Sequence, residues 1–125
     1  MPCPFCSVLQ ERILLESRTG LALPDAYPLC AGHTLIVSRR HVKTIYELTT
    51  EDQQDLWSLV FQVRHSLIEQ YASDAFNIGI NDGLNAGQTI DHAHIHVIPR
   101  RKGDVADPRG GIRWVIPDKA AYWKD

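Results

Sequence analysis

Hydrophobic residues recur with two different periods along the chain, and each period predicts a type of element. From Thr49 or Thr50 to Tyr71, apolar side chains recur every three or four residues, which is typical of an amphipathic helix. Thr50 and Gln53 have the spacing of a capping box at the start of this segment. The apolar stripe consists of Leu56, Leu59, Val60, Val63, Leu67, Ile68 and Tyr71. We expect this stripe to cover one face of a sheet.

Five shorter segments predict strands, because they are rich in β-branched residues or alternate between apolar and polar ones. These segments are residues 12–17, 21–25, 33–38, 75–80 and 92–98. The first two lie around the turn residues Arg18-Thr19-Gly20, which predicts a hairpin. The loop 82–88 is too short for the crossover that two parallel strands require. We therefore expect antiparallel neighbours, with the last two strands side by side.

The bulk composition is that of one soluble domain over residues 1–125. A net charge of -2 gives no general attraction to nucleic acid or to an anionic membrane, so the expected partner is a small molecule. No segment approaches the roughly 20 apolar residues of a membrane span. The first residues lack the basic and apolar regions of a signal peptide. These features predict a cytoplasmic protein.

Residues 100–125 are predicted to be a loop and a tail. The segment is basic and glycine-rich at first, and residues 112–116 are more strand-like. Trp114 and Trp123 are too large to be exposed without a reason, so we expect the tail to pack on the body of the protein or on a partner subunit.

Three histidines, His92, His94 and His96, alternate along the 92–98 segment. Successive side chains of a strand point to opposite faces, so these rings should line one face, roughly 6.6 Å apart. Imidazole can act as a nucleophile, a proton carrier or a metal ligand near neutral pH. An unpaired buried imidazole costs about 1–3 kcal/mol, which disfavours a purely structural row of three. A catalytic zinc ion held by all three rings is one alternative.

Cys3 and Cys6 have the spacing of half a zinc knuckle within residues 1–10. A redox dithiol is the alternative, but that motif normally opens a helix after a strand. Three cysteines are an odd number, which disfavours a disulfide framework in a cytosolic chain. Cys30 is expected to be a buried thiol.

The segment from Gly87-Gln88-Thr89 through the three histidines to Pro99-Arg100 resembles the signature of the histidine triad superfamily of nucleotide hydrolases and transferases. Residues 100–104 are most similar to the fragile-histidine-triad branch, which cleaves dinucleoside polyphosphates. The resemblance implies an α+β fold with an antiparallel five-stranded sheet, one long helix and one or more short helices. It also implies a homodimer whose sheet is continuous.

The same resemblance divides the roles of the site residues. It implies that His94 attacks the α-phosphorus of an adenine nucleotide to form a nucleotidyl-imidazole, and that His96 assists the phosphoryl oxygen or the leaving group. His33 would support the triad histidines without touching the substrate, and its alternative interpretation is a structural residue at the start of a strand. The implied nucleotide contacts are Asp25 with the ribose hydroxyls, Asn81, Gly87, Gln88 and Thr89.

Simpler interpretations exist for several of these residues. Asp25 can be a hairpin-turn aspartate, and Asn81 can start a turn. The loop 83–87 is not a P-loop, because no Gly-Lys-Ser/Thr follows it, and its glycines are expected to permit a tight turn. Residues 100–102 are interpreted as a solvated basic loop, with contact to the outer phosphates of a polyphosphate as the alternative.

Related proteins also suggest a partner for the cysteine pair. Some members of the superfamily, and the galactose-1-phosphate uridylyltransferases, complete such a pair with two histidines whose positions match His41 and His92. The resemblance therefore implies a structural zinc ion on Cys3, Cys6, His41 and His92, with a closed coordination sphere. The leading function is hydrolysis of dinucleoside polyphosphates. The alternatives are hydrolysis of nucleoside phosphoramidates and a nucleotide sensor with little turnover.

Overall fold

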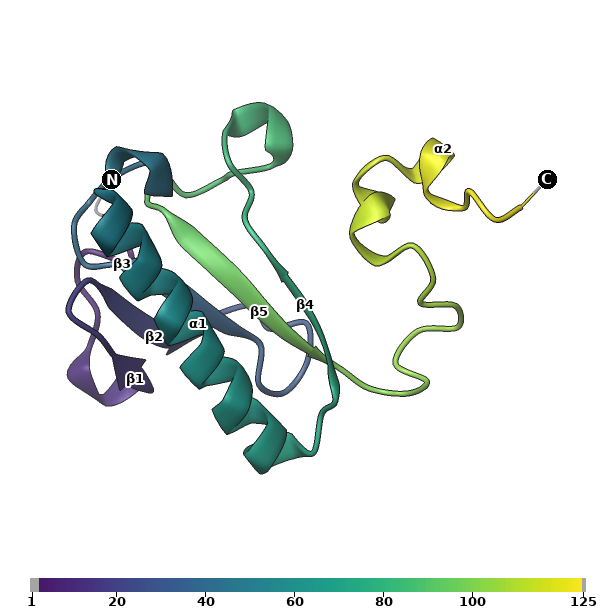
Figure 1. Cartoon of the computed structure of the whole chain (residues 1–125), viewed down its shortest axis with the longest axis horizontal. Helices are drawn as coiled ribbons and strands as arrows, with labels where there is room; N and C mark the ends of the chain where they lie inside the picture. Colours follow the sequence, from purple (N-terminus) through teal and green to yellow (C-terminus); the bar gives the residue numbers. More distant parts are fainter. Residues whose placement is uncertain (1–2, 125) are drawn as a thin grey trace.

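Five strands pair into one antiparallel sheet, and a long helix crosses one of its faces (Figure 1). This computed structural model describes residues 3–124. The strands are β1 (Leu15–Glu16), β2 (Gly20–Pro24), β3 (Thr34–Ser38), β4 (Ala75–Gly79) and β5 (His94–Arg100), in the spatial order β1-β2-β3-β5-β4. The α-helices are α1 (Thr50–Tyr71) and α2 (Pro117–Ala120), and the 3-10 helices are η1 (Gln10–Arg12), η2 (Ile45–Glu47), η3 (Leu84–Ala86) and η4 (Gly111–Val115). The α+β class, the hairpin and the antiparallel five-stranded sheet are confirmed.

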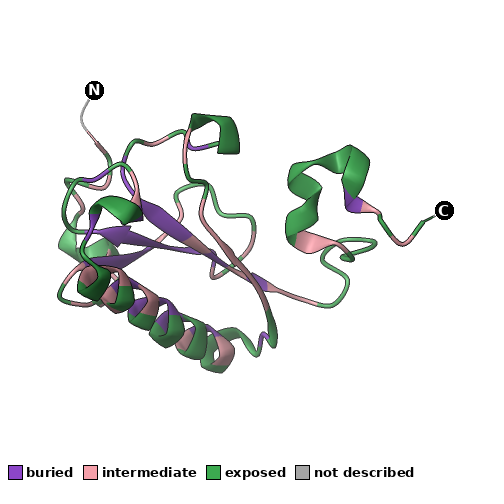
Figure 2. Ribbon diagram, turned by 45° about the horizontal axis from the view of Figure 1, so that its top comes forward, coloured by how far each residue is buried: buried purple, intermediate pink, exposed green. Residues whose placement is uncertain are grey.

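The N-cap of the long helix α1 lies one residue before the start of the predicted capping box. Thr49 is the N-cap, and its side chain accepts a hydrogen bond from the Asp52 amide at 3.1 Å. The expected Thr50–Gln53 box is wrong, because the Gln53 side chain instead donates through Nε2 to the Leu48 carbonyl. Five residues of the apolar stripe are buried as predicted: Leu56, Leu59, Val60, Val63 and Leu67. Figure 2 shows these buried positions on the side of the helix that faces the sheet.

The two faces of the sheet have different cores. Alternate residues such as Ile36 and Ile95 are fully buried beneath α1. The opposite face holds a smaller cluster of Leu21, Leu23, Leu35 and Val37, against which the N-terminal segment packs. In the β3–β5 register, Val37 lies opposite His94 and Leu35 lies opposite His96. Because opposed residues share a face, both histidines lie on the face away from α1.

The tail beyond β5 folds mainly on itself, beyond the β4 edge of the sheet (Figure 1). Its strand-like segment is not a strand: residues 111–115 form η4, which Gly110 and Gly111 enter with positive φ angles of 91° and 46°. Trp123 packs on the Arg109 guanidinium, 4.6 Å from the ring centroid, within the tail rather than on the body. Among residues 3–124, no helix is long and apolar enough to cross a membrane.

Candidate active site

His94 is oriented by the backbone of its own strand. It is 9 % exposed, and its Nδ1 lies 2.8 Å from the His92 carbonyl oxygen. A carbonyl only accepts hydrogen bonds, so Nδ1 carries the proton of the neutral ring. The lone pair of His94 is therefore on Nε2, which is the requirement for an imidazole nucleophile.

The His96 ring has the opposite proton arrangement, and a second histidine sets it. The Leu29 amide donates to His33 Nδ1 at 3.1 Å, so the proton of the neutral His33 ring lies on Nε2. That Nε2 lies 3.0 Å from His96 Nδ1. His96 Nδ1 therefore accepts, and its own N–H lies on Nε2. His94 and His96, with ring centroids 5.3 Å apart, thus pair a lone pair with a proton donor.

Asp25 completes this cluster from the end of β2. Its Oδ2 lies 3.3 Å from His33 Nε2 and 3.9 Å from His96 Nδ1, while its Oδ1 accepts the Tyr27 amide. Burial lowers the pKa of His96, and the neighbouring His94 and His33 lower it further, against the opposing effect of Asp25. Burial also lowers the pKa of His33, with Asp25 again opposing it. Both shifts favour the neutral form of the two rings.

The atoms of Asp25, His33 and His96 are close enough together to surround a metal ion. The Leu29 hydrogen bond opposes that interpretation, because it places the His33 proton on the nitrogen that would have to bind the metal. The hydrogen-bonded arrangement explains all three contacts without an ion.

His92 does not belong to the same row as the other two histidines. The strand β5 begins at His94, so the prediction that all three rings line one strand face is wrong for His92. Its Nε2 donates to the Ser38 carbonyl at 2.6 Å, which leaves the Nδ1 lone pair free. Burial lowers the pKa of this ring, and nearby His41 and His94 lower it further.

The free nitrogen of His92 faces a cysteine and histidine cluster. Its Nδ1 lies 3.2 Å from Cys3 Sγ, 3.7 Å from Cys6 Sγ and 3.1 Å from His41 Nδ1. Tetrahedral zinc, with bonds of about 2.3 Å to sulfur and about 2.0–2.1 Å to nitrogen, separates its ligand atoms by about 3.3–3.7 Å. Two thiols and two imidazoles at these separations match the donor set and size of a structural zinc site.

Sequence reasoning missed Phe5, which joins the two groups of residues. The ring lies edge-on to His92, with centroids 5.6 Å apart, and 5.3 Å from the His94 ring. An apolar residue enclosed by the cysteine pair was the available signal. The Leu29 amide and the Asp25–His33 contact were missed as well, because no local pattern marks them.

The loop before the triad is held by Gln88, which is buried. Its Oε1 accepts the Gly83 amide at 2.9 Å, and its Nε2 donates to the Lys43 and Ile90 carbonyls. Gly83 and Gly87 have positive φ angles of 103° and 98°, as a tight turn of glycines requires. A phosphoryl contact would require the Gln88 amide to exchange one of these bonds.

Two other predicted contact residues make no internal hydrogen bonds through their side chains. Asn81 and Thr89 are exposed, and neither side chain makes a hydrogen bond within residues 3–124. Both are free to bind a ligand.

The basic run after β5 is largely occupied by internal contacts. Arg100 donates to both Asp104 oxygens, at 2.7 and 2.9 Å, and holds the pKa of that carboxyl well below its usual range. Arg101 donates to the Ala31 carbonyl and lies over the Tyr71 ring. Arg100 follows His96 by four strand residues, or about 13 Å. These contacts favour the interpretation of a structural loop.

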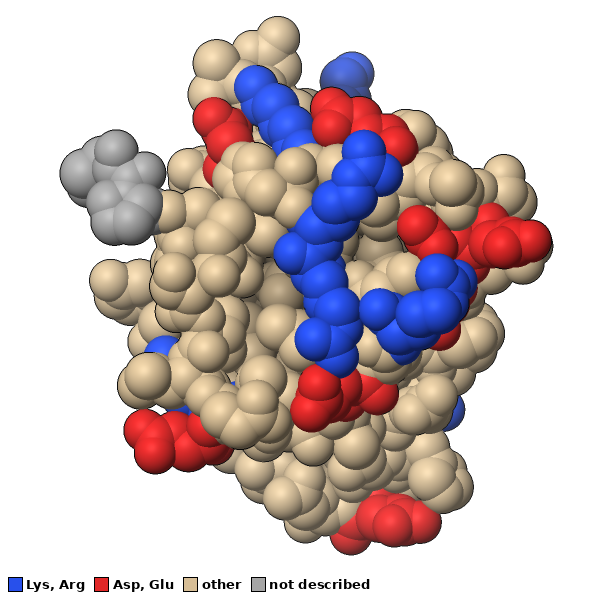
Figure 3. Space-filling model, turned by 90° about the vertical axis from the view of Figure 1, so that its left-hand side faces the viewer, with Lys and Arg blue, Asp and Glu red and all other residues tan. Residues whose placement is uncertain are grey.

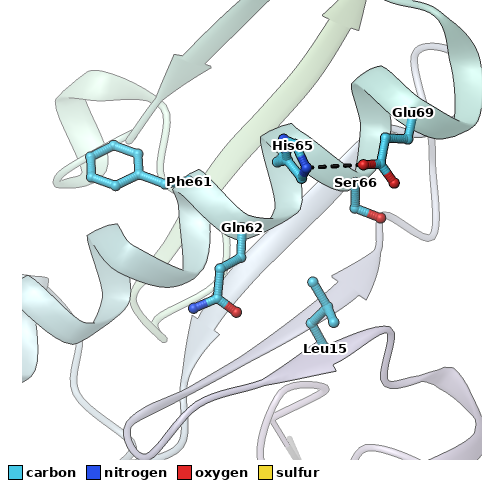
Figure 4. A pocket seen from close by; sticks show the side chains of 6 residues that line it. All are labelled: Leu15, Phe61, Gln62, His65, Ser66 and Glu69. Atoms are coloured by element: carbon cyan, nitrogen blue, oxygen red, sulfur yellow. Dashed lines mark ion pairs between the residues drawn. The ribbon is translucent and has the colours of Figure 1, made fainter.

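Other polar surfaces do not compete with this site. One side of the molecule carries a band of Lys and Arg with acidic groups beside it (Figure 3), and Arg18–Asp52 and Arg39–Glu16 are ion pairs. A hollow of about 470 Å³ lies between α1 and Leu15, on the helix side of the sheet (Figure 4). Its polar lining includes Gln62, Ser66 and the exposed His65–Glu69 pair, whose charged atoms are 3.0 Å apart.

Comparison with known proteins assigns this arrangement to a described family. A profile of the HIT domain matches residues 7–103. A bis(5'-nucleosyl)-tetraphosphatase (asymmetrical) of Schizosaccharomyces pombe is 33 % identical over 97 residues, 78 % of this chain and 53 % of the relative. A bis(5'-adenosyl)-triphosphatase of Dictyostelium discoideum is 36 % identical over 97 residues, 78 % of this chain and 65 % of the relative. The chain thus spans between half and two thirds of these relatives.

Solved structures share the fold. The NitFhit protein of Caenorhabditis elegans superposes with a TM-score of 0.76 at 28 % identity, over 93 % of this chain and 27 % of that one. A zinc-bound histidine triad family protein of Mycobacterium smegmatis gives a TM-score of 0.69 at 31 % identity, over 76 % of this chain and 69 % of that one.

Proposed function

The chain belongs to the HIT domain family, and on that premise we propose that it hydrolyses dinucleoside polyphosphates at the α-phosphate of an adenine nucleotide. The observation that carries this proposal is the complementary protonation of His94 and His96. A lone pair on one ring and an N–H on the next supply a nucleophile and a hydrogen-bond donor to the leaving or phosphoryl oxygen, which a phosphoryl transfer requires.

The reaction proceeds in two displacements. His94 Nε2 attacks the α-phosphorus, so that a phosphorus–nitrogen bond forms while the bond to the bridging oxygen breaks. The His96 Nε2–H donates to the departing oxygen or to a phosphoryl oxygen. Water then attacks the same phosphorus and loses a proton to solvent, and the phosphorus–nitrogen bond breaks to return His94 as the neutral ring with its proton on Nδ1. The His92 carbonyl, which accepts the Nδ1–H of His94, stabilises the positive ring of the intermediate.

The nucleotide itself is held by residues around the histidine cluster. We propose that Asp25 accepts the ribose hydroxyls and that Asn81, Gly87, Gln88 and Thr89 contact the nucleotide. Asp25 supports this best, since its carboxylate already lies 3.9 Å from His96. Its side chain is largely buried beside the proposed reaction centre.

A zinc ion is the proposed structural cofactor, held by Cys3, Cys6, His41 and His92. Four protein ligands leave no open position, so the ion would fix geometry and activate no water. Its support is the donor set and spacing of the cluster, together with the zinc-bound relative from Mycobacterium smegmatis. Phe5, between the two cysteine ligands, packs against the His94 ring and so links the cluster to the proposed nucleophile.

A homodimer and a cytoplasmic location complete the proposal. Strand β4 forms an edge of the sheet in the single chain, and a second copy that paired with this edge would continue the sheet. Acting on a small nucleotide requires neither nucleic acid nor membrane.

Brief exposure to α-labelled diadenosine triphosphate tests the reaction. We expect acid-labile label on His94, located by peptide mapping, and none on the His94→Ala protein. Turnover that survives in His94→Ala would overturn the nucleophile assignment. Nucleotide binding without turnover in the wild-type protein would indicate a sensor, and a preference for phosphoramidates would redefine the substrate.

A further inference from the structure

The C-terminal tail touches the sheet directly beside His96. Gly79 on β4 is the register partner of His96 on β5, so both face the same side. A Cβ atom built on Gly79 would lie 3.8 Å from Ile112 Cδ1 of η4. One on Gly111 would lie 3.3 Å from Asn77 Nδ2. The tail therefore forms a wall along β4 on the face that carries the catalytic histidines.

The strip of sheet beneath this wall continues away from the histidines. Asn77 and Gly79 of β4 share the face with His96, Ile98 and Arg100 of β5, by the alternation of the two strands. Gly79 has no side chain, so nothing projects from the sheet at this position next to His96. A hollow of about 340 Å³ lies at its far end. The residues that line the hollow are Arg100, Val105, Asp107, Pro108, Gly111 and Trp114.

The groups on this strip suit a nucleotide. Trp114 is 47 % exposed, and its Nε1 donates to the Arg109 carbonyl at 2.9 Å, which holds the indole in place as a flat surface for a base. Asn77 accepts from Arg100 Nη1 at 2.6 Å, which identifies the accepting atom as Oδ1. Its Nδ2 has no hydrogen-bond partner within the described chain, so it can donate to a phosphate or ribose oxygen.

The strip also lies on the correct side of the reaction centre. Strand β5 is between β3 and β4 in the sheet. Asp25, the proposed ribose ligand, approaches His96 from the side of β2 and β3, whereas Gly79 flanks it on the side of β4. With the α-phosphate at His94, the bound half extends toward Asp25. The side of Gly79 and the tail is then left for the other half of the substrate.

We propose that this strip, walled by Ile112 and Trp114, binds the leaving nucleotide of the dinucleoside polyphosphate. The inference rests on the proposed function. The tail would then influence the specificity for the leaving group. It would contact a leaving nucleotide, whereas a small leaving group would make no contact with it.

Two substrates with the same adenylyl half test this assignment. Trp114→Ala should lower kcat/KM for diadenosine triphosphate about tenfold, through KM, because a base loses its stacking surface. The same variant should change kcat/KM for adenosine 5'-phosphoramidate less than about twofold, because ammonia does not reach the strip. Val115→Ala is the matched control, since Val115 is 73 % exposed in the same 3-10 helix and does not line the hollow. The Val115→Ala protein should have the wild-type kcat/KM for both diadenosine triphosphate and adenosine 5'-phosphoramidate.

Binding measurements keep this test separate from the proposed function. In a His94→Ala background, Trp114→Ala should raise the Kd of diadenosine triphosphate about tenfold and leave the Kd of AMP unchanged. Equal losses with both substrates, or for both ligands, would show a structural role for Trp114 and overturn the inference. Unchanged constants would overturn it as well. If the wild-type protein turned over neither substrate, the proposed hydrolase would fail, while the two Kd values would still decide whether the strip binds the second nucleotide.

Discussion

His92 and His94 are two residues apart, yet they present opposite ring nitrogens to their surroundings. The Ser38 carbonyl accepts a hydrogen bond from the Nε2–H of His92, so the Nδ1 lone pair faces the cysteines. The His92 carbonyl accepts a hydrogen bond from the Nδ1–H of His94, so the lone pair of that ring is on Nε2. The position of one backbone carbonyl therefore decides which ring nitrogen of a histidine keeps a free lone pair.

Replacing His94 should have the largest effect on the reactive side of this comparison. His94→Ala removes the nucleophile and should lower kcat by about 10⁴-fold or more. Stopped assays with diadenosine triphosphate measure the loss. The melting temperature should stay within about 3 °C of the wild-type value, which separates lost chemistry from lost structure. A loss of less than about tenfold would argue that another group attacks the phosphorus.

Changes at the metal side should instead reduce stability. Cys3→Ser should lower the zinc content from about one per chain to well under one and reduce the free energy of unfolding by several kcal/mol. Elemental analysis and urea unfolding of protein without a polyhistidine tag measure both quantities.

Cys30→Ser is the matched control for that change. Cys30 is also a partly buried cysteine, but its Sγ contacts the Pro99 carbonyl and lies outside the cluster. The Cys30→Ser protein should bind as much zinc as the wild-type protein. Wild-type protein that binds well under one zinc per chain would contradict the proposed site.

The hydrogen bond that fixes the His96 tautomer can be removed without replacing any of the three triad histidines. His33→Ala removes the N–H that fixes the His96 proton, and should lower kcat about 100-fold with a smaller change in KM. His33→Gln places an amide N–H near the same position and should restore part of the rate. His65→Ala, on the exposed face of α1, should leave kcat unchanged. If His33→Ala and His33→Gln were equally slow, the proton assignment would be wrong.

The smallest expected effect is a dependence of stability on pH. Burial lowers the pKa of His33 and His96 in the folded protein, so the unfolded chain binds protons first as pH falls below about 6.5. The free energy of unfolding should therefore decrease with acidification. Urea titrations at several pH values should show a shallower decrease for His33→Gln than for the wild-type protein. An identical slope would remove His33 from the explanation.

Periodicity predicted the elements whose side chains face one core. The three-and-four spacing located α1, and alternation placed His94 and His96 on one face. His92 could not be placed in this way, because the Ala93 amide bonds to Val42 and β5 starts only at His94. That contact joins segments far apart in sequence. Residues 112–116 have β-forming composition, but no strand pairs with them, and they become part of η4 and its C-cap.

The candidate site divides along the same line. The cluster of Cys3, Cys6, His41 and His92 came from a resemblance, and the fold brings its four ligand atoms together. The hydrogen bond from the Leu29 amide to His33 had no counterpart in any sequence pattern, because it depends on how the β2–β3 connection turns. Ring protons are set by backbone groups, and backbone groups carry no residue-specific signal.

The contact between Cys3 and His92 spans 89 residues, and this distance has a consequence for the order of assembly. Contacts that close long loops form late, because their entropic cost is met only after the intervening chain has been organised. During synthesis, the contacts of the cysteine pair with His92 can form only after the segment that contains His92 and His94 has been made. Phe5 then reaches His94 only when that loop has closed. A chain interrupted before residue 92 therefore has neither the complete cysteine and histidine cluster nor His94, and the candidate site is among the last parts of the molecule to assemble.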